Sequence, residues 1–281
     1  IFKPFSYYAV APFIFSLFPL YECSVYLVNY SYSRLFSPKV KMCLRSDCLP
    51  SGVKTLAVIT TLIDGDGDEA LQKIEQYYIS NKYDGLLCGI LADLPDSDKA
   101  YSEKDEQIIS ALSEKIKALC EKYGDVFFLF YRGRRYSITQ GRFIAPERKR
   151  GAVLQMCRLL YTGQGDINIC GNAEALSGVK YLITLDFDTV MMPHTARRLT
   201  CVMEHPANKA VFDANGRIVR GHGILQPCVD TVFVNGKSAF SLMSSGNGGV
   251  QSYSNARFDI YEEIFKKGIF CGKGIINCEA F

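Results

Sequence analysis

Short apolar runs alternate along this chain with longer segments of helical periodicity. Runs rich in β-branched and aromatic residues predict buried strands, and apolar positions three and four apart predict helices. The expected strands cover residues 55–63, 86–91, 126–131 and 181–189, with one more inside 218–229, and the expected helices cover residues 68–81, 102–123, 147–160 and 193–204. Asn215-Gly216 predicts a tight hairpin turn of the primed type. The alternation predicts an α/β fold with a mostly parallel central sheet and helices on both faces.

The first 35 residues have another pattern, because they are apolar and aromatic with almost no charge. No charged residue lies between Lys3 and Glu22, and the next one is Arg34. Such a stretch is long enough to span a bilayer, although its prolines and Glu22 leave a tilted or interfacial helix as the alternative. Basic residues follow closely, which predicts a cytoplasmic location for the rest of the chain. The expected organisation is a membrane-associated segment at 1–35, a linker at 36–50 and a folded domain at 51–281.

Composition describes a folded protein with reduced thiols. The chain has 281 residues, of which 48% are hydrophobic, so it can bury a large core. Its eleven cysteines include no C-x-x-C pair and are accompanied by three histidines. Neither a disulfide framework nor a zinc site is indicated.

Positive charge is concentrated in one segment. Residues 132–150 contain seven basic residues against the single acidic Glu147, while the whole chain has a net charge of +3. A local cluster of this kind indicates an anionic ligand such as a phosphate, and not the broad basic face that nucleic acid requires. A solvated basic loop is the alternative.

Two aspartates end the most apolar of the expected strands. In residues 181–189, Y-L-I-T-L-D-F-D-T, Asp186 and Asp188 lie two positions apart and point to the same side of an extended chain. Paired hard oxygens suit Mg²⁺ or Mn²⁺, and a metal at the carboxyl end of a strand would meet a diphosphate. The same spacing recurs at Asp96 and Asp98, which remain an alternative site. The acidic cluster at 64–69 is expected instead to supply the N-cap and first-turn negative charge of a helix.

Three further residues lie in loops where a ligand is expected. Asp93 follows the second strand and either accepts hydrogen bonds from a nucleobase or ribose, or caps the turn before Pro95. Lys149 and Arg150 lie at the start of a helix, where charge and backbone N–H groups together favour a phosphate.

Six motifs in this order resemble the membrane-bound glycosyltransferase domain of cyclic β-1,2-glucan synthases. The resemblance runs from about Ser51 to the end of the chain. The motifs are Glu147-Arg-Lys-Arg-Gly151, Ile183-Thr-Leu-Asp-Phe-Asp-Thr189, Ala196-Arg-Arg-Leu199, Gly223-Ile-Leu-Gln-Pro227, Asp259-Ile-Tyr261 and Gly272-Lys-Gly-Ile275.

The resemblance implies a GT-A type nucleotide-sugar-binding fold in a bacterial inner-membrane protein. It implies UDP-glucose as donor and inverting transfer of glucose to a growing β-1,2-glucan acceptor. The roles it implies are a uridine contact for Asp93, phosphate contacts for Lys149 and Arg150, metal ligands for Asp186 and Asp188, and sugar or acceptor contacts for Gln226 and Lys273.

The chain also departs from that family. Asn277 and Glu279 replace aspartates, His222 replaces a tyrosine, and the catalytic base is expected beyond Phe281, with Glu279 as the candidate inside the chain. We therefore expect residues 1–281 to bind the donor without elongating a glucan. Another UDP-sugar glycosyltransferase, a metal-dependent nucleotidyl- or phosphoryl-transfer protein, and a catalytically incomplete nucleotide-sugar-binding domain remain alternatives.

Overall fold

The computed structural model describes residues 10–35, 49–65, 67–229, 238 and 270–281. Helix α1 (Val10–Leu35) belongs to one compact unit, and the other described elements belong to a second. The helices of the second unit are α2 (Asp68–Asn81), α3 (Glu103–Tyr123), α4 (Arg148–Thr162), the 3₁₀ helix η2 (Ala173–Leu176) and α5 (Thr195–Glu204). Most of the expected linker, and the motif at Asp259, lie outside the described residues.

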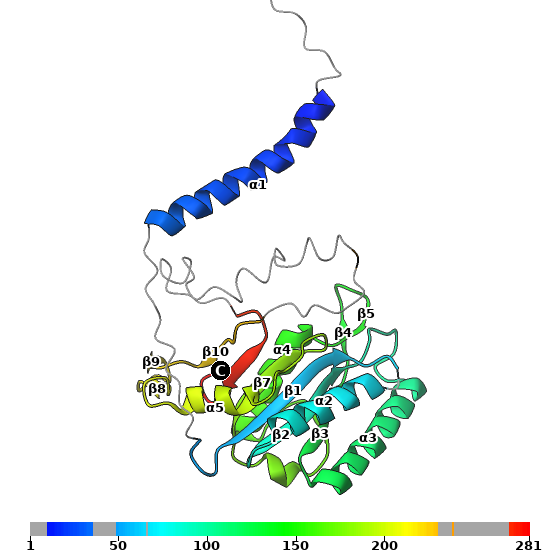
Figure 1. The fold of residues 1–281 in the computed structure, drawn as a ribbon. Coiled ribbons are helices and arrows are strands. Elements are labelled where there is room, and N and C mark those ends of the chain that lie inside the picture. The colour runs from blue at the N-terminus through cyan, green and yellow to red at the C-terminus, as the bar shows by residue number, and fades with distance from the viewer. Residues whose placement is uncertain (1–9, 36–48, 66, 230–237, 239–269) are drawn as a thin grey trace, which may run out of the picture. The chain divides into compact units, whose positions relative to one another are not determined.

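A seven-stranded sheet forms the centre of the second unit, in the order β10-β11-β7-β1-β2-β3-β6 (Figure 1). Its strands are β1 (Lys54–Leu62), β2 (Leu86–Asp93), β3 (Phe127–Arg132), β6 (Asn168–Cys170), β7 (Val179–Asp186), β10 (Ile224–Leu225) and β11 (Gly274–Asn277). The four strands β7, β1, β2 and β3 are parallel, and the outer three are antiparallel to their neighbours. The predicted mixed α/β fold with a mostly parallel sheet is therefore confirmed.

Helices cover both faces of this sheet, as the sequence predicts. One hydrophobic cluster packs α2, α3 and α5 against the sheet through residues such as Ile74, Leu112 and Ala196. The other packs α4 against the opposite face through Met156 and its neighbours. All eight residues of β2 are buried, which explains why its sequence is almost continuously apolar.

Helix boundaries follow local chemistry closely. Helix α2 has the predicted bounds, and α3 begins at Glu103 because Ser102 caps it. The Ser102 hydroxyl accepts from the amide of Asp105, whose carboxylate accepts from the Ser102 amide at 2.8 Å. This capping box satisfies two amides that have no partner inside the helix.

Three local predictions are wrong. The expected strand 181–189 ends at Asp186, because the Thr189 amide donates to the Asp186 carbonyl at 3.0 Å and turns the chain, so Asp188 lies in a turn and not on an extended strand with Asp186. The N-cap of α2 is Gly67, with φ 67° and no side-chain cap, so the acidic cluster supplies only first-turn charge through Asp68 and Glu69. The hairpin between β8 (Val211–Phe212) and β9 (Ile218–Arg220) has a positive φ at Gly216 and not at Asn215. Its turn is closed by the Gly216 amide donating to the Asp213 carbonyl at 3.1 Å, a longer loop than a two-residue primed turn.

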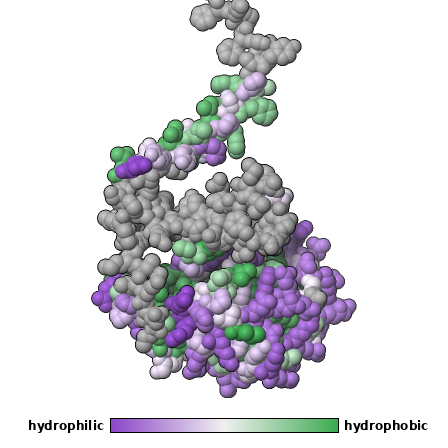
Figure 2. Space-filling view, viewed as in Figure 1, coloured by the Kyte–Doolittle hydropathy of each residue, from purple (hydrophilic) through white to green (hydrophobic). Residues whose placement is uncertain are grey.

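Helix α1 is long and apolar enough to cross a membrane. Its residues Val10–Tyr32 have a mean hydropathy of 1.4, and the helix continues through Pro19. The hydroxyls of Ser16, Ser24 and Ser31 donate to carbonyls three or four residues earlier, so each is satisfied within the helix. Figure 2 shows apolar side chains along α1, whereas hydrophilic side chains dominate the visible face over α3.

Candidate functional site

The strand order reverses at the boundary between β1 and β7. From β1 the chain proceeds outward through β2 and β3, and it later returns to add β7 on the other side of β1. In open α/β sheets, ligands bind beyond the carboxyl ends of the strands at such a point. Asp186 is the last residue of β7 and is in register with Thr60 of β1. The aspartate pair thus lies where this topology favours a ligand.

Two lysines contact the first of these aspartates. Lys149 donates from Nζ to Oδ1 of Asp186, and Nζ of Lys273 lies 3.3 Å from its Oδ2. Nζ of Lys273 also lies 3.7 Å from Oδ1 of Asp188. The side chain of Asp188 is 83% exposed and that of Asp186 is 35% exposed, so Asp186 is the less screened partner. We call Lys149, Asp186, Asp188 and Lys273 the lysine–aspartate cluster.

The turn before β11 places Lys273 in this cluster. A Cβ on Gly272, whose φ is +78°, would lie 3.0 Å from Nζ of Lys149, so glycine leaves room for the lysine. The Gly272 carbonyl accepts from the Thr184 hydroxyl at 3.1 Å. Oε1 of Gln226 accepts from the Cys271 amide at 2.7 Å, so Gln226 supports the turn that carries Lys273.

The start of α4 carries the other lysine. Its first three residues, Arg148 to Arg150, are all basic, and no acidic residue lies in its first turn. The positive end of the helix dipole disfavours such charge unless an anion is nearby. Asp186 supplies one negative charge there, and a bound phosphate would supply more.

Arg150 does not contact Asp186. Its side chain is 82% exposed, and its Nε lies 3.0 Å from Oε2 of Glu147. Arg148 is likewise paired elsewhere, because its Nη2 donates to Oδ2 of Asp96 at 3.0 Å. In the alternative aspartate pair, Asp96 is therefore already ion-paired with a residue of the basic segment.

Asp93 lies at the end of β2 and is buried. Arg132 binds its carboxylate with two bonds, Nε to Oδ1 at 2.7 Å and Nη2 to Oδ2 at 2.6 Å. The side chains of Arg132 and Asp93 are 2% and 7% exposed. Arg132 was not singled out from the sequence, where it is one of seven basic residues; only its place at the end of a predicted strand could have indicated it.

Glu279 follows the carboxyl end of β11, beside the amino end of β7, whereas the lysine–aspartate cluster lies at the carboxyl end of β7. Strand β11 runs antiparallel to β7, so Asn277 pairs with Tyr181, and the next amide donates to the Lys180 carbonyl at 3.1 Å. A strand rises about 3.3 Å per residue, which separates Glu279 from Asp186 by on the order of 20 Å. Glu279 as a base acting beside Asp186 is therefore inconsistent with the fold.

A divalent metal fits the lysine–aspartate cluster as a partner shared with phosphate. Asp186 and Asp188 offer hard carboxylate oxygens, and Mg²⁺ commonly binds one or two carboxylates together with substrate phosphates and water. Among the described residues, no group of three or more His, Cys, Asp or Glu side chains could hold a metal. The donor set therefore suits a cation whose coordination the substrate completes.

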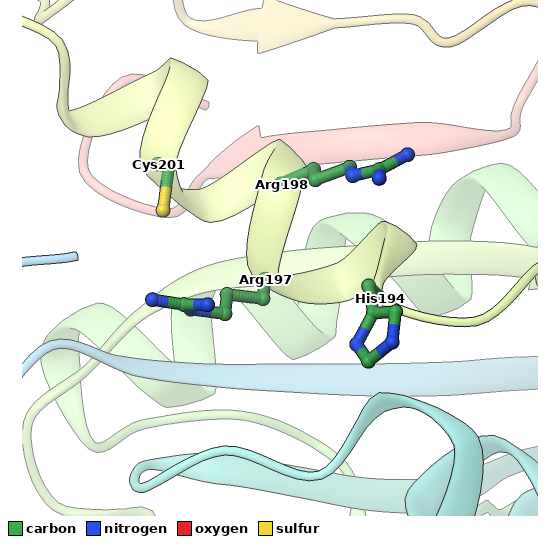
Figure 3. Close-up of a pocket in the computed structure, with 4 residues that line it drawn as sticks. All are labelled: His194, Arg197, Arg198 and Cys201. Atoms are coloured by element: carbon green, nitrogen blue, oxygen red, sulfur yellow. The ribbon is translucent and has the colours of Figure 1, made fainter. Parts of the chain in front are cut away.

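A separate hollow lies on α5. It has a volume of about 310 Å³, and the described residues that line it are His194, Arg197, Arg198 and Cys201 (Figure 3). None of the predicted site residues is among them. The strand order and the ion pairs locate the candidate site at the lysine–aspartate cluster.

Comparison with known proteins supports the family resemblance that the sequence motifs indicate. No family model matches the chain. It is similar to cyclic beta-(1,2)-glucan synthase NdvB from Rhizobium meliloti (strain 1021), with 30% identity over 245 residues. The match covers 84% of this chain and 9% of that protein, so the chain spans less than a tenth of the length of this curated relative.

Proposed function

This chain belongs to the cyclic β-1,2-glucan synthase family, and from this premise we propose that it forms the donor-binding part of a glycosyltransferase. The donor is UDP-glucose, the acceptor is a growing β-1,2-glucan, and the fold is of the GT-A type. The observation that carries this proposal is the lysine–aspartate cluster at the point where the strand order reverses. Two carboxylates and two ammonium groups together match a metal-bound diphosphate.

The ammonium groups of Lys149 and Lys273 provide positive charge where the leaving diphosphate would gain negative charge. Asp186 and Asp188 would hold Mg²⁺ or Mn²⁺, which acts as a Lewis acid on the diphosphate when bound. The lysines add their charge from fixed positions, because one comes from a helix start and the other from a turn tied to β7. Charge that is already in place requires no rearrangement as the bond breaks.

The transfer itself is a single displacement. The acceptor 2-hydroxyl oxygen forms a bond to the anomeric carbon while the bond from that carbon to the diphosphate oxygen breaks, which inverts the configuration. A base must take the hydroxyl proton. Glu279 is too distant for this role, and we assign no described residue to it.

Helix α1 is proposed to hold the protein at a lipid bilayer, with the second unit on the cytoplasmic side of a bacterial inner membrane. Its length and hydropathy support the first part, and the basic residues that follow it support the second. Nucleic acid is not a proposed partner, because the basic segment is local.

Calorimetry on the 281-residue chain tests the donor. UDP and UDP-glucose should bind more tightly with Mn²⁺ than without it, and both more tightly than ATP. Lys117→Ala is the matched control, because Lys117 is exposed on α3, remote in sequence from every residue of the cluster. A preference for ATP would favour the nucleotidyl- or phosphoryl-transfer alternative. Binding of UDP-glucose with neither hydrolysis nor transfer of its glucose would favour an incomplete binding domain.

A further inference from the structure

Arg132 is a buried arginine whose hydrogen bonds join three segments. Besides its two bonds to Asp93, it donates from Nη1 to the Pro146 carbonyl at 3.1 Å and from Nη2 to the Arg148 carbonyl at 2.9 Å. The acceptors therefore come from the end of β2 and from the start of α4. A buried guanidinium without such partners would be strongly destabilising.

The backbone between those two carbonyls is strained. Glu147 has φ 54° and Arg148 has φ 44°, so two consecutive non-glycine residues occupy the left-handed region. Such a conformation is unfavourable for a residue with a side chain and persists only where its surroundings fix it. Arg132 binds the carbonyls on either side of Glu147, so it is placed to fix this turn.

Gly151 shows how closely the turn is packed. A Cβ there would lie 2.3 Å from the Pro146 carbonyl oxygen and 3.0 Å from Nη1 of Arg132. Lys149 follows the strained turn directly, and its ammonium group reaches Asp186. The contacts thus run from Asp93 through Arg132 and the turn to Lys149.

We propose that Arg132, anchored by Asp93, is a positioning residue that sets the left-handed turn at Glu147–Arg148 and thereby fixes Lys149 for the donor diphosphate. This assigns Asp93 to the anchor and not to a uridine contact, since both of its oxygens bind Arg132 and its side chain is 7% exposed. The inference rests on the proposed function only in taking a diphosphate as the ligand of Lys149.

Arginine is required at this position because of its shape. Its planar fork reaches two carboxylate oxygens and two carbonyls at once, whereas lysine is a point charge with three donors. Arg132→Lys keeps the charge and loses the geometry. Asp93→Asn keeps the volume and loses the charge.

The test is a double-mutant cycle read by calorimetry with UDP and with uridine. Arg132→Lys and Lys149→Ala should each weaken UDP by about tenfold and leave uridine within about twofold, because Lys149→Ala removes a charge-assisted contact to phosphate and Arg132→Lys displaces the lysine that makes it. In the Lys149→Ala background, Arg132→Lys and Asp93→Asn should have little further effect, since residues acting through one contact are not additive. Equal loss of UDP and uridine in Asp93→Asn, additive with Lys149→Ala, would instead make Asp93 a uridine contact and overturn the proposal.

A second measurement does not depend on nucleotide binding. The amide of Gly151 donates to the Glu147 carbonyl at 3.3 Å, so it reports on the turn. Its hydrogen-exchange protection should fall in Arg132→Lys and stay unchanged in Lys149→Ala. If the wild-type chain binds no UDP, the proposed function fails and this measurement alone decides the positioning role. Unchanged protection in Arg132→Lys would refute it, and circular dichroism identifies a variant that has simply unfolded.

Discussion

The ammonium group of Lys73 lies 3.8 Å from the ring centroid of Phe187 and donates to the Phe187 carbonyl at 2.8 Å. Phe187 is the residue between the two aspartates of the cluster. Lys73 also lies 2.8 Å from Oε1 of Glu69, one turn earlier on α2. On the same helix, the Tyr77 hydroxyl donates to the Thr189 carbonyl. Helix α2 therefore holds the aspartate turn at two carbonyls.

Replacing Lys73 by methionine should loosen this turn. The variant keeps an apolar stem but loses the cation–π contact and the bond to the carbonyl, which are each worth about 1 kcal/mol. We expect several-fold weaker UDP binding in the presence of Mn²⁺ and a lower urea midpoint. Lys117→Met, on the exposed face of α3, is the control. UDP affinity equal to that of the wild type would show that the turn holds its shape without Lys73.

The metal dependence of UDP binding should depend on the aspartate pair. Asp186→Ala or Asp188→Ala removes one hard-oxygen ligand, so adding Mn²⁺ should no longer strengthen UDP binding. Asp186→Ala should also release Lys149 and Lys273, and UDP binding without metal should be better preserved in this variant. Calorimetry with and without Mn²⁺ measures both effects. Full metal dependence in both variants would locate the metal elsewhere, with Asp96 and Asp98 as the next candidates.

Lys273 and Arg150 should contribute very differently to UDP binding. Lys273 is 18% exposed and contacts both aspartates, whereas Arg150 is 82% exposed and is paired with Glu147. Lys273→Ala should weaken UDP by about tenfold with little change for uridine, and Arg150→Ala should have an effect of less than about threefold. Titration of both ligands against both variants checks this. A larger loss in Arg150→Ala would mean that its side chain turns toward the phosphates when the donor binds.

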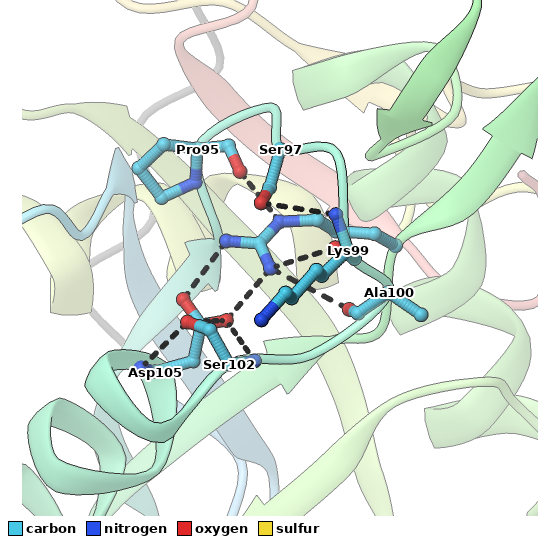
Figure 4. A network of polar contacts seen from close by, with 7 residues as sticks. Pro95, Ser97, Lys99, Ala100, Ser102 and Asp105 are labelled. Atoms are coloured by element: carbon cyan, nitrogen blue, oxygen red, sulfur yellow. Dashed lines mark hydrogen bonds and ion pairs between the residues drawn. The ribbon is translucent and has the colours of Figure 1, made fainter.

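The ion pair of a second buried arginine predicts that the stability of the fold falls at acidic pH. Arg134 donates to both carboxylate oxygens of Asp105, at 2.7 and 2.8 Å, and also to backbone carbonyls of the loop after β2 (Figure 4). These bonds from Arg134 lower the pKa of Asp105 below its usual value. The ionised form therefore stabilises the fold at every pH above the unfolded pKa of about 3.9, and this contribution is lost as the pH falls through the folded pKa.

Asp105→Asn should remove that part of the acid dependence. Urea midpoints measured from neutral pH down to about pH 2 should fall less steeply in the variant than in the wild type, from a lower starting value. Asp166→Asn is the comparison, because its ion pair with Arg135 is more than 60% exposed on both sides. Parallel pH profiles for Asp105→Asn and the wild type would contradict the assignment.

Sequence reasoning found the elements whose chemistry is local. The strands of the parallel core are almost continuously apolar, the helical periodicity of α2 and α3 is clear, and Asp186 ends its apolar strand, with Asp188 in the turn that follows. Contacts between distant segments were missed, since Arg132 meets Asp93 39 positions away and Lys73 meets Phe187 114 positions away. The Glu279 candidate failed for a related reason. Local sequence does not fix the direction of a strand, and β11 runs back toward the amino end of β7.

The position of β1 between β2 and β7 has a consequence for folding. One side of β1 pairs with β2, the next strand along the chain, and the other side pairs with β7. The second pairing joins distant residues, since the Thr60 hydroxyl donates to the Leu185 carbonyl 125 residues away. Closing so long a loop lowers the chain entropy before any stabilising contact forms, so such pairings form slowly. The β1–α2–β2–α3–β3 segment can assemble first, and the sheet edge that carries Asp186 is completed last. In a nascent chain the candidate site is therefore the final part of the described sheet to form.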